Sequence, residues 1–213
     1  MTETTELPLF PTSAPQVFCD ADATRVLFSD TLDALAGVVD IDDDQLTLAT
    51  PCSQYDVGEL RHHVLGWLDF FATALTDPPA RSPRPDPEAF SLADGERASD
   101  AVRRCSAEIQ QAIADDVASQ AVTMSQARMA GDGVLAMALG EYLVHAWDLA
   151  TATGRAYEPP ADAVVPAHEF LLGMVAPEYR GPDSGFFDEE VPVPEDAPDF
   201  DRLLGFAGRD PNA

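Results

Sequence analysis

The sequence contains no lysine. All twelve basic residues are arginine, against 38 aspartates and glutamates. The formal charge of −26 argues against nucleic acid as a partner, because proteins bind nucleic acid by neutralising its phosphates with basic side chains. It argues equally against an anionic membrane surface. Acidity of this kind serves solubility, with a halophilic source as the alternative interpretation.

Long apolar runs are also missing. No run approaches the roughly 18 residues that a membrane-spanning helix needs, so no membrane span is predicted. The stretch MTETTELPLF has neither the basic start nor the apolar centre of a signal peptide, and we expect a cytoplasmic protein. Cys19, Cys52 and Cys105 form no C-x-x-C pair, and we interpret each as a buried or idle thiol.

The hydrophobic pattern predicts helices along most of the chain. Apolar residues recur at helical spacing over 21–39, 57–76, 94–116, 133–153 and 160–175, with one or two further turns over 199–207. An extended piece is indicated only at residues 122–124. The sequence therefore predicts an all-α fold, a helix bundle.

Turn residues set the boundaries of this bundle. Asp56, with Glu59 three residues later, predicts a capping box at the start of the second helix. Gly154 suits the position just after a helix end. We expect three parts: an irregular N-terminal arm over 1–20, the helix bundle over 21–176, and a Pro- and acid-rich segment over 177–213 that packs on the bundle.

Several polar residues fall on the inner faces of two predicted helices. At about 100° per residue, His63 lies about 60° from Leu60 at the edge of an apolar stripe, whereas His62 lies about 200° away on the solvent side. In helix 133–153, Glu141 and His145 lie close to the apolar line and are i, i+4 neighbours. Asp148 lies near the same line.

Burying a carboxylate beside an imidazole requires a partner for both. One interpretation is a Glu141–His145 ion pair or hydrogen bond in the core. The other is a shared metal that His63 completes from the neighbouring helix. Two histidines and one carboxylate suit Zn²⁺ with an open position, and Fe²⁺ and Ni²⁺ accept the same set. Asp148 is either the acceptor for a ligand imidazole N–H or a partner in a helix-terminal hydrogen bond.

Other polar and aromatic residues carry weaker signals. Trp67 and Trp147 are most simply core or groove residues, and His168 has no partner in spacing. Arg155 follows a helix end and either binds the last carbonyl groups or holds a substrate anion. No G-x-G-x-x-G, P-loop, G-x-S-x-G or H-E-x-x-H motif is present.

Three segments together resemble a known family. TPCSQYDVGELRHHVLG (50–66), EYLVHAWDLATATGRAY (141–157) and VPVPEDAPDFDRLLGFAGRDP (191–211) are similar to blocks of the DinB-like superfamily. They most resemble the actinobacterial branch grouped with the mycothiol-dependent maleylpyruvate isomerase N-terminal domain. The resemblance implies a four-helix up-down-down-up bundle with a divalent metal, most simply Zn²⁺, on His63, Glu141 and His145.

The resemblance also implies a chemistry. In such proteins the metal is expected to hold mycothiol as a thiolate, which is then added to an unsaturated acid or put on another electrophile. A small-molecule substrate is expected on the open metal face near Trp67 and Tyr142, with Asp148 orienting a ligand. The chain departs from the family at His62 and at Gly66-Trp67, which predicts a narrowed or aromatic-lined pocket. It also ends without the isomerase's second domain, so maleylpyruvate isomerisation itself is not expected.

Three hypotheses follow from the sequence. The first is a metal-dependent, thiol-using transferase or isomerase. The second is a pathway-specific tailoring enzyme recruited from the same bundle, with or without metal. The third is a non-catalytic metal-binding or stress-response protein. A monomer or a homodimer is compatible with each of them.

Overall fold

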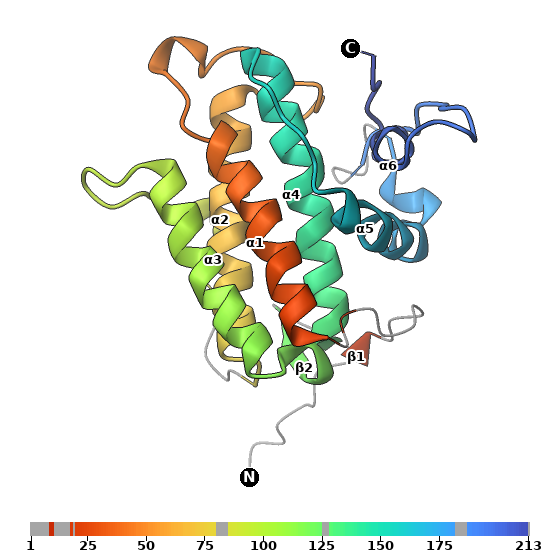
Figure 1. Cartoon of the computed structure of the whole chain (residues 1–213). Coiled ribbons are helices and arrows are strands. Elements are labelled where there is room, and N and C mark those ends of the chain that lie inside the picture. Colours follow the sequence, from red (N-terminus) through yellow and green to blue (C-terminus); the bar gives the residue numbers. More distant parts are fainter. Residues whose placement is uncertain are drawn as a thin grey trace.

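The computed structural model describes residues 9–10, 18, 20–79, 85–124, 128–181 and 187–212. The fold is mostly helical, and four long helices form its centre: α1 (Ala21–Val38), α2 (Val57–Thr76), α3 (Ala98–Ala114) and α4 (Gly131–Thr153). Figure 1 shows these four helices side by side. Each of α1 and α2 packs against both α3 and α4.

The ends of these helices follow from local sequence. Asp56 accepts a hydrogen bond from the Glu59 backbone N–H at 2.9 Å, and the Asp56 N–H donates to the Glu59 carboxylate at 3.0 Å. This confirms the predicted capping box of α2. Gly154 closes α4 with a φ of +67°, as predicted, because glycine adopts left-handed backbone without strain.

The core lies between the four long helices. The leucines of α4 and the apolar stripe of α2 are almost completely buried. Burying one such side chain contributes on the order of 1.5–3 kcal/mol. The α4 helix is buried nearly all round, so its few polar side chains lie inside the protein and need partners there.

A small sheet adds to the predicted all-α fold. It has the order β1-β3-β2 and consists of β1 (Leu9–Phe10), β2 (Ala121–Thr123) and β3 (Arg128–Ala130). β1 pairs parallel with β3, and β2 pairs antiparallel with it. Residues 9–10 of the expected irregular arm therefore form a strand, because they pair with β3, which is distant in the sequence. Residues 1–8, 11–17 and 19 of that arm lie outside the described residues.

Two further helices lie on one side of the long four. α5 (Ala161–Met174) packs on α4, and α6 (Asp199–Phe206) packs on α5. Single turns of 3₁₀ helix connect the elements: η1 (Asp43–Gln45), η2 (Pro87–Ala89), η3 (Val117–Ser119) and η4 (Pro177–Tyr179). Among the helices that the structure describes, none has the length and apolar character to cross a membrane.

Candidate metal centre

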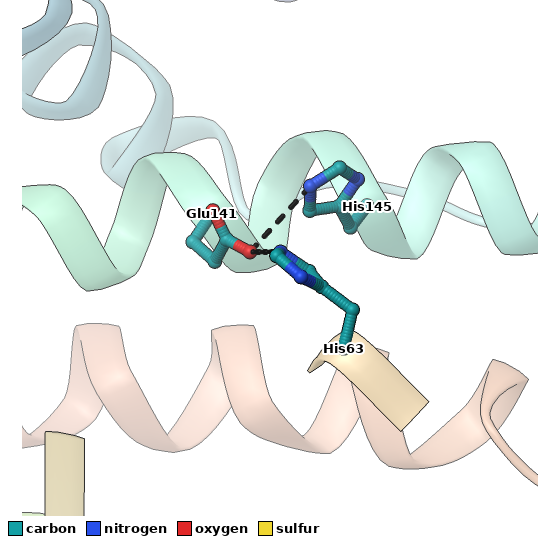
Figure 2. Close-up of side chains that lie close together, drawn as sticks. All are labelled: His63, Glu141 and His145. Atoms are coloured by element: carbon teal, nitrogen blue, oxygen red, sulfur yellow. Dashed lines mark hydrogen bonds and ion pairs between the residues drawn. The ribbon is translucent and has the colours of Figure 1, made fainter. Parts of the chain in front are cut away.

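Three predicted side chains meet between α2 and α4. His63 Nε2 lies 2.9 Å from Glu141 Oε1, and His145 Nε2 lies 3.5 Å from the same oxygen. One ligand atom from each residue lies within 4.8 Å of the others (Figure 2). Both imidazoles thus present Nε2 to one carboxylate oxygen.

Helix geometry places these groups. Glu141 and His145 are one turn apart on α4, so their side chains share a face. His63 projects from α2 toward them, whereas the His62 Nε2 lies 3.2 Å from the carbonyl oxygen of Glu88, next to η2. A Cβ on Gly66 would lie 2.1 Å from the Pro87 carbonyl oxygen, so only glycine lets η2 approach α2 here.

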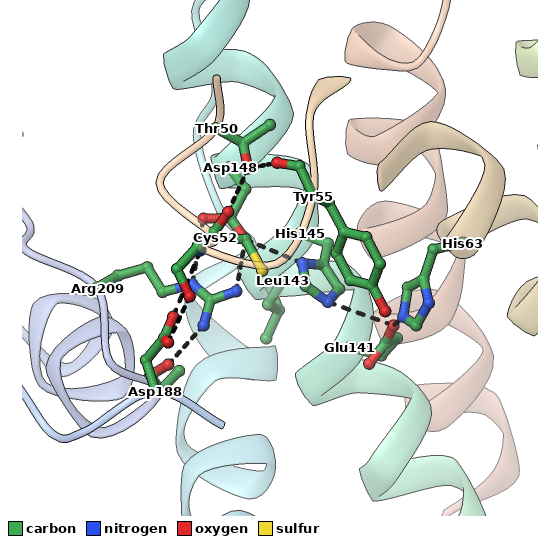
Figure 3. Close-up of polar contacts among 12 residues, drawn as sticks. Thr50, Cys52, Tyr55, His63, Glu141, Leu143, His145, Asp148, Asp188 and Arg209 are labelled. Carbon is green, nitrogen blue, oxygen red and sulfur yellow. Dashed lines mark hydrogen bonds and ion pairs between the residues drawn. The ribbon is translucent and has the colours of Figure 1, made fainter. Parts of the chain in front are cut away.

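Two buried charged side chains, Asp148 and Arg209, lie on the Nδ1 side of His145. The Asp148 carboxylate is fully buried and lies 2.9 Å from His145 Nδ1. Arg209, which is 5% exposed, donates to both Asp148 oxygens, from Nη2 at 3.0 Å and from Nε at 3.3 Å (Figure 3). Burial alone would raise the pKa of Asp148, but the hydrogen bond from His145 and the charge of Arg209 lower it.

This arrangement fixes the proton of His145. An ionised carboxylate only accepts hydrogen bonds, so His145 Nδ1 is the donor. A neutral His145 then presents the lone pair of Nε2 to the Glu141 carboxylate. Two acceptors facing each other at 3.5 Å need a proton or a cation between them.

The charges at Glu141 and His63 stabilise each other. Burial acts to raise the pKa of Glu141, but the charge of His145, the hydrogen bond from His63 and the charges of His63 and Arg209 outweigh it and lower the pKa to about 2. Burial acts to lower the pKa of His63, and the contact with Glu141 raises it overall. Glu141 is therefore a carboxylate at neutral pH, which is the form that binds metals.

The donor set fits a divalent metal. In a tetrahedral zinc site, ligand atoms about 2.0–2.1 Å from the ion lie about 3.3 Å from each other. The distances of 2.9 and 3.5 Å from the two imidazoles to Glu141 bracket that value. The three side chains are 11–25% exposed, so the cluster is reachable from solvent.

Comparison with known proteins shows the family of the chain. The model of the mycothiol maleylpyruvate isomerase N-terminal domain matches residues 28–150, more than half of the chain. The chain belongs to this family. It is a metal-binding, mycothiol-related family of DinB-like helical domains, as the resemblance implied.

Two curated relatives of this DinB-like domain come from Mycobacterium tuberculosis, strains CDC 1551 / Oshkosh and ATCC 25618 / H37Rv, and both are described as uncharacterized proteins. Each is 32% identical over 169 residues, which covers 78% of this chain and 86% of the relative. No solved structure matches the chain.

The other side chains expected at the site of this DinB-like domain lie around or away from the cluster of His63, Glu141 and His145. Trp67 packs against His63, with ring centroids 6.2 Å apart. Tyr142 is fully buried, with its ring edge-on to Phe71, so it lies in the core rather than on an exposed face. The Arg155 side chain donates to the carbonyl oxygen of Val38 at the end of α1, whereas the carbonyl groups at the end of its own helix, α4, were the expected partners. The roles of Trp67, Tyr142 and Arg155 toward a substrate stay predictions.

Two neighbours of the cluster were not expected from the sequence. The Tyr55 ring lies 4.8 Å from the His63 ring, centroid to centroid, at an interplanar angle of 32°. Arg209 reaches Asp148 from the C-terminal segment. The signal for Arg209 is the buried position of Asp148 on α4, since a buried carboxylate calls for a basic partner. Tyr55 precedes the capping box and carries no periodic signal.

Proposed function

We propose that this chain is a metal-dependent enzyme that activates mycothiol, or a similar small thiol, for addition or transfer to an electrophilic small molecule. The observation that carries the proposal is the convergence of His63 Nε2, Glu141 and His145 Nε2 on one point. Family membership supports the use of mycothiol. Zn²⁺ is the metal proposed first, since two imidazoles and one carboxylate leave an open position on it.

Each residue has a part in this proposal. His63, Glu141 and His145 hold the cation, which when bound lowers the pKa of a coordinated thiol so that it reacts as a thiolate at neutral pH. Asp148 accepts a hydrogen bond from the Nδ1–H of His145, which leaves the Nε2 lone pair of His145 available to the cation. Tyr55 and Trp67 lie against His63 and provide apolar surface beside the cluster.

The proposal extends to the fold and to the place of action. The pairwise packing of α1 to α4 supports a DinB-like four-helix bundle with the up-down-down-up order. The lack of a spanning helix among the described residues and the family's small-thiol chemistry support a cytoplasmic site of action.

Metal analysis of purified protein tests the site. Wild-type protein is expected to carry about one zinc per chain, and His145→Ala and His63→Ala to lose it. His62→Ala is the matched control, because this adjacent histidine contacts Glu88 instead of the cluster. Stoichiometric zinc that survives His145→Ala contradicts the proposed ligands.

A thiol assay tests the chemistry separately. Zinc-loaded protein is given mycothiol and a panel of electrophiles, and the loss of free thiol is followed. We expect consumption by the wild type and none by His145→Ala. Protein that holds zinc but neither binds nor consumes mycothiol rejects the thiol chemistry while leaving the metal site in place.

A further inference from the structure

The C-terminal segment 187–212 reaches the metal centre from outside the part of the chain that the family model matches. That match ends at residue 150. Arg209 is 5% exposed, and its guanidinium lies against Asp148 on α4. A residue about sixty positions further along the chain thus completes the surroundings of His145 (Figure 3).

The backbone around Arg209 directs this side chain inward. Gly208 follows the end of α6 with a φ of +84°, and a Cβ there would lie 2.6 Å from the Cβ of Asp188. The Arg209 N–H donates to the Leu204 carbonyl at 2.9 Å, and its Nη1 donates to the Ala207 carbonyl at 2.6 Å. The turn and the close packing both require glycine at position 208.

The contact of Arg209 with Asp148 orients the Asp148 carboxylate. Arg209 donates to each carboxylate oxygen, which fixes the plane of the Asp148 carboxylate. The same Oδ2 that receives Nη2 at 3.0 Å also lies 2.9 Å from His145 Nδ1. Fixing this oxygen fixes both the ring plane and the tautomer of His145.

We infer that Arg209 is a positioning residue of the metal centre, acting on His145 through Asp148. The inference rests on the proposed function, because it assigns Arg209 a role toward the metal proposed there. The competing explanation is that Arg209 only fastens the C-terminal segment to α4. Outer partners of metal-binding histidines change metal affinity by about 10- to 100-fold, whereas a fastening contact changes stability alone.

Arg180 provides the matched control. Its Nη1 donates to the carbonyl oxygens of Asp188 at 3.1 Å and Phe206 at 2.8 Å, and its guanidinium lies 4.4 Å from the Phe206 ring centroid. It therefore fastens the same segment. Arg180→Met is expected to loosen the C-terminal segment, and it removes none of the side chains in the Arg209–Asp148–His145 contacts.

The experiment measures zinc affinity by competition with a chromophoric chelator on the full chain. Arg209→Met is expected to weaken zinc binding about 10- to 100-fold. Arg209→Lys is expected to weaken it less, because one ammonium reaches only one carboxylate oxygen at a time. Arg180→Met is expected to bind zinc as the wild type does and to lower the unfolding midpoint. Equal affinity in Arg209→Met and wild type, or equal losses in Arg209→Met and Arg180→Met, overturns the inference.

Two additions keep the outcome decisive. If Arg209→Met does not fold, the double variant Asp148→Asn/Arg209→Met removes both buried charges, and it is expected to show the same loss of zinc affinity. Imidazole ¹⁵N NMR of the metal-free protein is expected to show a single Nδ1–H tautomer for His145 in the wild type and a mixture in Arg209→Met. Wild-type protein that binds no zinc rejects the proposed function, whereas zinc binding that is indifferent to Arg209 rejects only the positioning role.

Discussion

His145 and His63 face the same carboxylate from very different surroundings. His145 lies 2.9 Å from a fully buried carboxylate, Asp148, which Arg209 holds in turn. His63 has an aromatic ring, Tyr55, on one side, and among the described residues its buried Nδ1 has no hydrogen-bond partner. On the side away from Glu141, one imidazole is thus held by a charged pair and the other by packing.

This difference predicts that the α4 side of the cluster, with His145, is more rigid than the α2 side, with His63. Charged hydrogen bonds in a dry interior are strong and directional, so the His145 ring has one orientation and one tautomer. The ring contact with Tyr55 is weaker and less directional, so apart from its contact with Glu141 the His63 ring is freer to adjust. The α4 side therefore forms a rigid support and the α2 side an adaptable one.

Replacing Asp148 is expected to have the largest effect. Asp148→Ala leaves the guanidinium of Arg209 buried and unpaired, and breaking a buried pair in this way costs about 3–5 kcal/mol. Urea unfolding of the metal-free protein measures the loss. Asp40→Ala is the control: Asp40 is 24% exposed, pairs with Arg97 and accepts from the Ser99 N–H, and its loss is expected to cost about 1 kcal/mol. Equal losses in the two variants contradict a rigid α4 side.

Gly208 tests the turn that brings Arg209 to this support. Gly208→Ala combines a φ of +84° with a 2.6 Å approach to Asp188 and is expected to destabilise the protein by about 1–3 kcal/mol. Gly154→Ala is matched to it, since Gly154 has a φ of +67° with open space around it, and its cost is expected near 1 kcal/mol. Thermal unfolding compares the two. A larger loss in Gly154→Ala would show that close packing at Gly208 is unimportant.

Removing the aromatic ring beside His63 tests the adaptable side. Tyr55→Leu keeps an apolar side chain there but removes the ring that lies on His63. We expect zinc affinity to fall by less than about tenfold, below the effect typical of an outer hydrogen-bond partner. The same chelator competition measures it. A loss of zinc affinity in Tyr55→Leu as large as in Arg209→Met would show that His63 and His145 depend equally on their outer neighbours.

The sequence predicted the helices and the ligand set better than the supports around them. The three side chains that cluster could be predicted because His63, Glu141 and His145 obey helical periodicity, which is a local property. The strand β1 and the Arg209–Asp148 contact both depend on residues more than fifty positions apart, and no local pattern encodes such a pairing. Tyr142 was expected near the open metal face, but it is fully buried, because the helix residue after Glu141 points about 100° away from it, into the core.

The thiols are expected to show the smallest effect, and they distinguish a change on the α4 side from a loosening of the whole core. Burial raises the pKa of Cys52, and it raises the pKa of Cys105 to about 12, so both thiols are expected to alkylate slowly. Cys52 lies close enough to Arg209 for that charge to act on it, whereas Cys105 lies on α3. The charge of Arg209 acts to lower the pKa of Cys52, so peptide mass spectrometry after iodoacetamide treatment should find both thiols protected in the wild type, and Cys52 alone slower still in Arg209→Met. Faster alkylation of Cys52 and Cys105 alike would instead mean that the variant loosens the whole core, and that the α4 side is no separate support.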